Sequence, residues 1–148
     1  MNARAATDDE ALSEDEDSLI RFENGSRSNY PVVALLERFS RRGNRTAVTV
    51  GDERTTYAEL AGMSYAAARS LREAGVTAGT TVGLLLDRGA AWIATFLGTQ
   101  LLGGVSVPLD VDAPDRDVID RLALARPGIL VRGRSVAAAR RAARLIGP

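Results

Sequence analysis

Four charged side chains that could bind a ligand or take part in catalysis follow directly after predicted strands. Asp87 and Arg88 follow one apolar run, and Asp110 and Asp112 follow the next. Open α/β sheets commonly bind ligands at the carboxyl ends of their strands. Asp110 and Asp112 could bind Mg²⁺ through oxygen, but two carboxylates without a third partner make a poor site. Loop solvation and favourable charge near a helix start explain these residues more simply, so we predict no metal site and assign no catalytic residue.

Two further pairs of residues suggest catalysis or phosphate binding, but a structural role explains each pair better. Tyr57 and Glu59 offer a hydroxyl and a carboxylate, but Thr56 stands three residues before Glu59, which is the spacing of a capping box at a helix start. Gly103 and Gly104 follow a predicted helix and precede a predicted strand. That order is the reverse of the strand, loop and helix order that directs backbone amides at a phosphate. The sequence therefore leaves the cofactor-binding residues unknown.

Composition excludes several kinds of catalysis. All 19 basic residues are arginine, and the chain has no lysine, histidine or cysteine. The usual general base, Schiff-base amine, thiolate nucleophile and transition-metal ligands are therefore missing. No apolar run approaches the length of a membrane span, and the N-terminus is acidic, so we expect a cytoplasmic protein that does not bind membranes. No aromatic residue lies among the C-terminal arginines, so we expect no nucleic-acid binding.

The elements that position these residues begin after an acidic segment. Residues 1–18 are polar and acidic, which predicts a disordered tail, and residues 19–148 are assigned to one folded unit. The pattern predicts a helix from Pro31 to Gly43, a hairpin from Thr46 to Thr55 and a helix that begins at Thr56. The apolar stripe expected on this last helix is Leu60, Met63, Ala67 and Leu71.

From residue 81 onward, predicted strands and helices alternate. The strands are expected at 81–86, 105–109 and 129–131, with a mostly buried helix at 90–102 between the first two. An amphipathic helix opens at Pro114 and carries its apolar residues at Val118, Ile119, Leu122 and Leu124. A last helix is expected at 136–146. This spacing suits βαβ units, so we predict an α/β fold with a mostly parallel sheet.

Two segments resemble the first two core motifs of adenylate-forming enzymes, most closely the adenylation domains of nonribosomal peptide synthetases within the AMP-dependent synthetase and ligase family. Residues 55–60 read TTYAEL, where the family has Leu-Thr-Tyr-x-Glu-Leu. Residues 101–110 read LLGGVSVPLD, where the family motif ends Ala-Gly-x-x-x-Val-Pro-Leu-Asp. The family motif residues are Thr56, Tyr57, Glu59, Leu60, Gly103, Gly104, Val107, Pro108, Leu109 and Asp110.

The resemblance implies an incomplete N-terminal subdomain of an adenylation domain. In the family, the phosphate loop, the substrate pocket, an ATP-ribose aspartate and a C-terminal lysine lie beyond the position of Pro148. We therefore expect a truncated or split fragment related to ATP-dependent activation of amino, aryl or fatty acids as acyl adenylates. It is not expected to be catalytic alone, and whether it acts as an enzyme stays open. The complete family enzyme uses ATP and magnesium, whereas no cofactor is expected for the isolated chain.

Two kinds of partner follow from this interpretation. A split adenylation domain needs a complementary fragment or a synthetase chain that carries the missing parts. The alternative is a non-catalytic interaction or docking module for a synthetase partner, with the acidic tail as the docking element. Self-association is a further expectation, because a sheet that is cut short leaves an open edge and an uncovered apolar face.

Overall fold

The computed structural model describes residues 30–133 of the 148-residue chain. The predicted tail at 1–18 and the predicted helix at 136–146 lie outside the described residues. The elements in chain order are α1 (Tyr30–Arg42), β1 (Thr46–Val50), β2 (Glu53–Thr56), α2 (Tyr57–Glu73), β3 (Thr81–Leu85), α3 (Ala90–Leu101), β4 (Val105–Leu109), α4 (Asp115–Ala125) and β5 (Ile129–Arg132). The type and order of the elements predicted within this range are confirmed.

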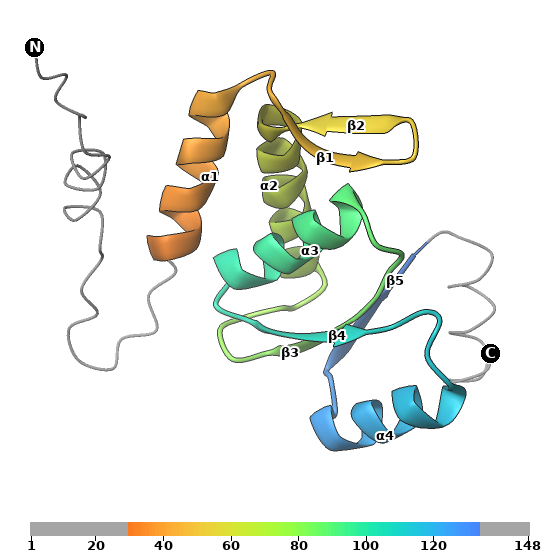
Figure 1. Ribbon diagram of the computed structural model, residues 1–148. Helices are drawn as coiled ribbons and strands as arrows, with labels where there is room; N and C mark the ends of the chain where they lie inside the picture. Colours follow the sequence, from red (N-terminus) through yellow and green to blue (C-terminus); the bar gives the residue numbers. More distant parts are fainter. Residues whose placement is uncertain (1–29, 134–148) are drawn as a thin grey trace, which may run out of the picture.

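The strands form an antiparallel hairpin and a separate parallel sheet (Figure 1). β1 pairs with β2, and the larger sheet has the order β4-β3-β5. Gly83 at the centre of β3 lies opposite Val107 of β4 on one side and Leu130 of β5 on the other. The parallel pairing of consecutive strand and helix units confirms the predicted α/β class.

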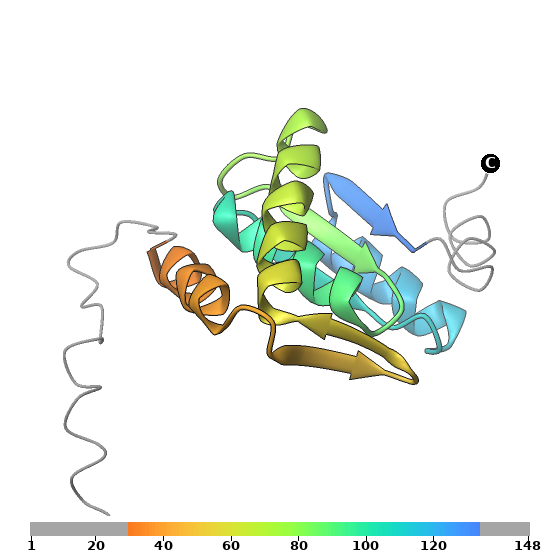
Figure 2. The ribbon, with the colours of Figure 1, turned by 90° about the horizontal axis from the view of Figure 1, so that it is seen from above.

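Helices cover the sheet on both faces, with α2 and α3 above it and α4 below it in Figure 1. Val82 and Leu84 belong to a core cluster with Leu71 of α2, against which Phe96 of α3 packs. Leu85 belongs to a second cluster, on the α4 side. Because successive side chains of a strand point to opposite faces, the single strand β3 supplies both cores. Figure 2 shows α1 outside α2, away from the sheet.

The buried stripe of α2 differs from the predicted one. The buried residues are Leu60, Ala61, Ser64, Ala68 and Leu71. Met63 was expected in the core but is 37% exposed, and Ala67 is only partly buried. The reason is the close crossing of α3, because a Cβ at Gly98 would lie 2.8 Å from the Ala68 backbone nitrogen and 3.0 Å from the Ser64 carbonyl oxygen. Small side chains therefore face α3, and Met63 is displaced toward the side of the helix.

The apolar face of α4 is narrower than the sequence pattern indicates. Val118 is fully buried and Leu122 packs against the same cluster, but Ile119 is 48% exposed and Leu124 is 87% exposed. Within the described residues, α4 is the only helix on its face of the sheet, so nothing there covers its outer side. The helix ends at Arg126, which takes the left-handed conformation with φ of 43°.

Candidate functional site

The connections after β3 and β4 diverge at the carboxyl ends of these strands. β3 leads into α3 on one face of the sheet, and β4 leads into α4 on the opposite face (Figure 1). Such a divergence is a topological switch point, where neighbouring loops separate and leave a crevice that commonly binds ligands in α/β proteins. The topology of these two connections therefore indicates that the candidate site lies at the carboxyl ends of β3 and β4.

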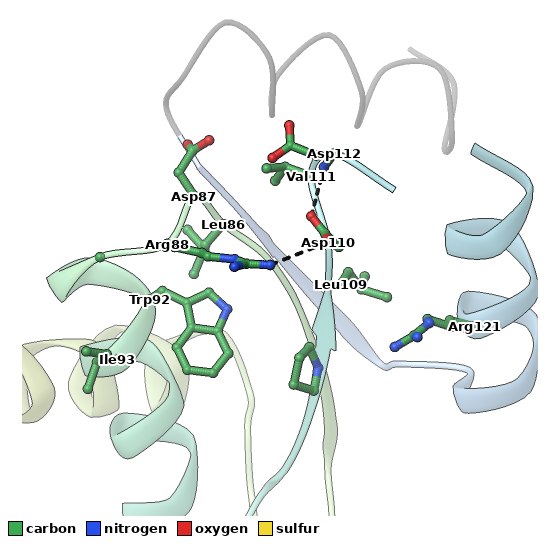
Figure 3. Close-up of a pocket in the computed structure, with 12 residues that line it drawn as sticks. Leu86, Asp87, Arg88, Trp92, Ile93, Leu109, Asp110, Val111, Asp112 and Arg121 are labelled. Carbon is green, nitrogen blue, oxygen red and sulfur yellow. Dashed lines mark hydrogen bonds and ion pairs between the residues drawn. The ribbon is translucent and has the colours of Figure 1, made fainter. Parts of the chain in front are cut away.

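A cavity of about 700 Å³ occupies this position. Asp87 and Arg88 line it from the loop after β3, and Asp110 and Asp112 line it from the loop after β4 (Figure 3). These are the four residues that the sequence places after the two strands, and the fold brings them together around one cavity. The volume lies within the range of small-molecule sites in proteins.

Apolar side chains form the wall of the cavity below this charged rim. Trp92 and Ile93 come from the first turn of α3, and Pro108 comes from β4. The indole of Trp92 stacks on Phe96 one turn further along α3, with 5.6 Å between ring centroids and an interplanar angle of 6°. Such a stack restricts the orientation of the indole, so the cavity has one well-defined aromatic wall.

An ion pair links the two loops at the rim. Nη2 of Arg88 lies 3.7 Å from Oδ2 of Asp110, and the two side chains are 92% and 47% exposed. Exposed pairs of this length contribute little to stability. Oδ1 of Asp110 also accepts a hydrogen bond of 2.9 Å from the Asp112 backbone amide, which is a typical Asx turn. The Asp110 carboxylate therefore stabilises the turn after β4 and also contributes a negative charge to the rim of the cavity.

The rim does not have the geometry of a magnesium–nucleotide site. Within residues 30–133, no three acidic side chains converge closely enough to hold a metal ion. The rim carries the three carboxylates of Asp87, Asp110 and Asp112 against the guanidinium groups of Arg88 and Arg121. Excess negative charge of this kind disfavours a polyphosphate. The residues present therefore do not fit Mg²⁺ with ATP.

The first motif lies at the start of α2 and outside the cavity. The Glu59 amide donates to Oγ1 of Thr56 at 3.2 Å, and the Thr56 amide donates to Oε2 of Glu59 at 2.8 Å, which completes the capping box expected from the spacing. The hydrogen bond that the Thr56 amide donates to the Glu59 carboxylate, followed by the one of 2.9 Å that the Thr56 hydroxyl donates to Oε2, lowers the pKa of Glu59 below its ordinary value. Tyr57 packs edge-on against Phe39 at 5.1 Å, beneath the Arg42 guanidinium. This motif joins α1 to α2, and its last residue, Leu60, is buried.

The second motif ends at the cavity. Gly103 has φ of 69° and closes α3, and a Cβ at Gly104 would lie 2.9 Å from the Thr99 methyl group. Both glycines therefore let α3 turn tightly into β4. Three later motif residues, Pro108, Leu109 and Asp110, line the cavity, and Val107 packs in the core beside α4.

Sequence reasoning missed the wall of the cavity. Trp92 and Ile93 belong to an apolar run that predicts only a buried helix, and Arg121 lies on a helix distant in sequence. The signal for Trp92 was its place in the first turn after a strand end, which puts it at the switch point. Arg121 had no comparable signal, because its position depends on how α4 packs on the sheet.

No helix within residues 30–133 combines the length and apolar character that crossing a membrane would need.

Comparison with known proteins identifies the family. Residues 35–146 match the family model of AMP-binding enzymes. Tyrocidine synthase 2 of Brevibacillus parabrevis is 35% identical over 125 residues, which cover 81% of this chain and 4% of that protein. Nonribosomal peptide synthetase 13 of Aspergillus fumigatus is 42% identical over 103 residues, which cover 70% of this chain and 5% of that protein.

A solved structure agrees with these relatives. The N-terminal subdomain of Klebsiella oxytoca NpsA in complex with anthranilyl-AMSN is 26% identical, with a TM-score of 0.61 over 66% of this chain and 26% of that chain. The chain thus spans a small part of the length of the synthetases it matches and about a quarter of that subdomain. It belongs to the AMP-binding enzyme family and corresponds to part of the N-terminal subdomain of a nonribosomal peptide synthetase adenylation domain.

Proposed function

We propose that this chain supplies the first part of an adenylation-domain subdomain and acts only together with polypeptide that carries the rest. The joint activity would be the ATP-dependent activation of an amino, aryl or fatty acid as an acyl adenylate. The observation that supports this most is the agreement in fold with solved N-terminal subdomains over about a quarter of their length. A segment that keeps the family fold contributes a scaffold, and chemistry then depends on the remainder.

The described residues support a scaffold role over independent catalysis. The cavity rim does not fit magnesium with ATP, and the whole chain contains no lysine to neutralise a developing phosphate charge. Among the motif residues, Glu59 is engaged in the helix cap and Asp110 in a loop turn. We infer that ATP and magnesium are held by the rest of the adenylation domain, and that this chain supports the elements around them.

Exchange of radiolabelled pyrophosphate into ATP tests the proposal directly. We expect no exchange by the purified 148-residue chain with any carboxylic acid, because the chain has no lysine and no three acidic side chains within residues 30–133 converge to hold magnesium. We expect exchange when the chain is co-expressed with the remainder of an adenylation domain. The matched control is the same remainder expressed without the chain. Exchange by the isolated chain would contradict the proposal.

Calorimetry separates binding from turnover. Titration of the isolated chain with ATP and magnesium, and then with an acyl-adenylate sulfamoyl analogue, should give no saturable heat. A complex that forms with the remainder but shows no exchange would instead support the alternative function, a non-catalytic docking module for a synthetase.

A further inference from the structure

Three arginines at the end of α1 form no ion pair with any acidic side chain in residues 30–133. Arg38 and Arg42 lie one turn apart on α1, and the Arg45 amide donates to the Arg42 carbonyl at 3.3 Å in the turn that follows. All three residues are exposed, and Figure 2 shows α1 at the outside of the described fold. We call Arg38, Arg42 and Arg45 the α1 arginine surface.

The carboxylates nearest in sequence to this surface and to Tyr57 are engaged by other groups. Oε2 of Glu37 lies 3.9 Å from Nη2 of Arg41, and the Glu59 carboxylate accepts from Thr56. The Arg42 guanidinium lies over the ring of Tyr57, 5.4 Å from its centroid, which is a neutral partner. Like charges one turn apart on a helix repel each other. The α1 arginine surface therefore carries positive charge that the described residues leave unbalanced.

The dipole of α1 accounts for only part of this charge. The carboxyl end of a helix carries a partial negative charge, so cations in its last turn are favourable. The basic residues in the last turn of α1 are Arg41 and Arg42. Arg38 precedes that turn and Arg45 follows the helix, so the dipole explains neither of them. An anionic ligand would instead interact with the whole cluster.

The same chain contains a segment of matching charge. Residues 8–17 are acidic at every position except Ala11, Leu12 and Ser13, and we call this segment the acidic run. It lies before the part that matches the family model, residues 35–146. Blocks of like charge are commonly interaction segments. The acidic run is therefore a feature of this chain that its family membership does not explain.

The acidic run is tethered within reach of the arginines. Residues 18–29 connect it to the start of α1, and a chain of this length can extend over about 40 Å. The 13 residues of α1 span about 20 Å, so the run can reach the far end of the helix. A tether this short gives an effective concentration of about 1 mM or more, so even a weak contact can form.

We propose that the acidic run, residues 8–17, binds the α1 arginine surface of the same chain. This inference goes beyond the proposed function, because it concerns a segment outside the matched part of the family. It also has a consequence for the docking alternative. A basic partner that binds the acidic run must first displace it from Arg38, Arg42 and Arg45, so removal of these charges should strengthen such docking.

A spin label in the acidic run tests the contact in the full chain. The chain has no cysteine, so S13C takes a nitroxide at one defined position. We expect the amide NMR signals of residues 38–45 to lose about half their intensity or more, because a tethered site of millimolar affinity is about half occupied. The same sample with the nitroxide reduced gives the reference intensities. Salt at about 1 M, where the Debye length is about 3 Å, should restore the signals.

Matched variants in the S13C background separate this surface from general charge effects. R38Q/R45Q removes two positive charges and keeps the packing of Arg42 on Tyr57, and it should restore the signals. R69Q/R72Q removes the same charge from exposed positions of α2 and should leave the signal loss unchanged. E14Q/D15N/E16Q/D17N neutralises part of the acidic run without altering the folded part, and it should also restore the signals. The amide shifts of β3 check that each variant folds.

Four results would each overturn the inference. The first is full intensity at residues 38–45 in low salt, and the second is equal signal loss in R38Q/R45Q and R69Q/R72Q. The third is signal loss that persists when the acidic run is neutralised. The fourth comes from a mixture of spin-labelled chain with isotope-labelled, unlabelled-cysteine-free chain: if it reproduces the whole signal loss, the run binds a second copy and not its own α1.

Discussion

Glu59 is the acidic residue whose environment the fold defines most clearly. Its carboxylate accepts from the amide and the hydroxyl of Thr56 at 2.8 and 2.9 Å, and these bonds lower its pKa. A carboxyl group with a lowered pKa in the folded state stabilises the fold when it is ionised. This contribution is complete above the ordinary value of about 4.3 and disappears as the pH falls through the lower folded value.

The capping box gives a prediction at the scale of single residues. Replacement of Thr56 by alanine should lower the free energy of unfolding by about 1 kcal/mol, because an amide at the start of α2 loses its acceptor. E59Q should lose the pH dependence described above. Urea unfolding between pH 3 and 7 measures both effects. E73Q is the control, since that carboxylate lies in the last turn of α2, and a loss as large as that of T56A would contradict the assignment.

The sequence predicted residues well where local spacing decides their role. Thr56 and Glu59 were placed correctly because a capping box involves only neighbours in the chain. Asp87 and Asp110 were placed correctly because strand ends are visible as the ends of apolar runs. Met63 was placed wrongly in the core, since its exposure depends on how closely α3 approaches α2.

At the scale of elements, the crossing of α2 and α3 controls the packing above the sheet. Gly98 allows it, because any Cβ there would meet backbone atoms of α2 at 2.8 to 3.0 Å, and backbone cannot move aside as a side chain can. Gly62 lies on the same pair of helices, but a Cβ there would meet nothing within 4 Å. The two glycines therefore have different roles despite similar helical positions.

Replacement of these glycines by alanine separates the two roles. G98A should destabilise the fold by about 1 to 3 kcal/mol through overpacking. G62A should leave stability unchanged or raise it by up to about 1 kcal/mol, because alanine favours the helix over glycine. Thermal and urea unfolding of the two variants measure the difference. Equal effects of the two substitutions would show that α2 and α3 do not cross as described.

The order of the helices and strands was predictable from the sequence. Which of their apolar residues are exposed to solvent was less predictable. The alternation of strands and helices follows from apolar runs separated by glycine, proline and charge, and each such boundary is local. The exposure of Ile119 and Leu124 on α4 was not predictable, because their spacing is that of a helix with both sides covered. The cavity wall at Trp92 likewise depended on two loops that diverge to opposite faces.

At the scale of the whole molecule, apolar side chains remain exposed on the described surface. Leu124 is 87% exposed, and Val50, Val105 and Ile119 are about half exposed. Isolated exposed apolar residues are common, but several on one small domain favour association. We therefore propose that the free chain self-associates weakly through α4.

Sedimentation velocity over a range of concentrations tests this proposal. L124S should weaken self-association and change the free energy of unfolding by less than about 0.5 kcal/mol, because the side chain is almost fully exposed. A123S, the adjacent exposed position, is the control and should associate as wild type does. A wild-type chain that stays monomeric at all concentrations would contradict the proposal, and so would equal association of L124S and A123S.

The stack of Trp92 on Phe96 has a consequence for how the molecule can be observed. Trp92 is the one tryptophan of the chain, and its indole forms a wall of the cavity at the switch point. Indole emission shifts to shorter wavelengths when water leaves its surroundings. The natural fluorescence of the unlabelled protein therefore reports whether the cavity beside Trp92 is open to solvent or covered.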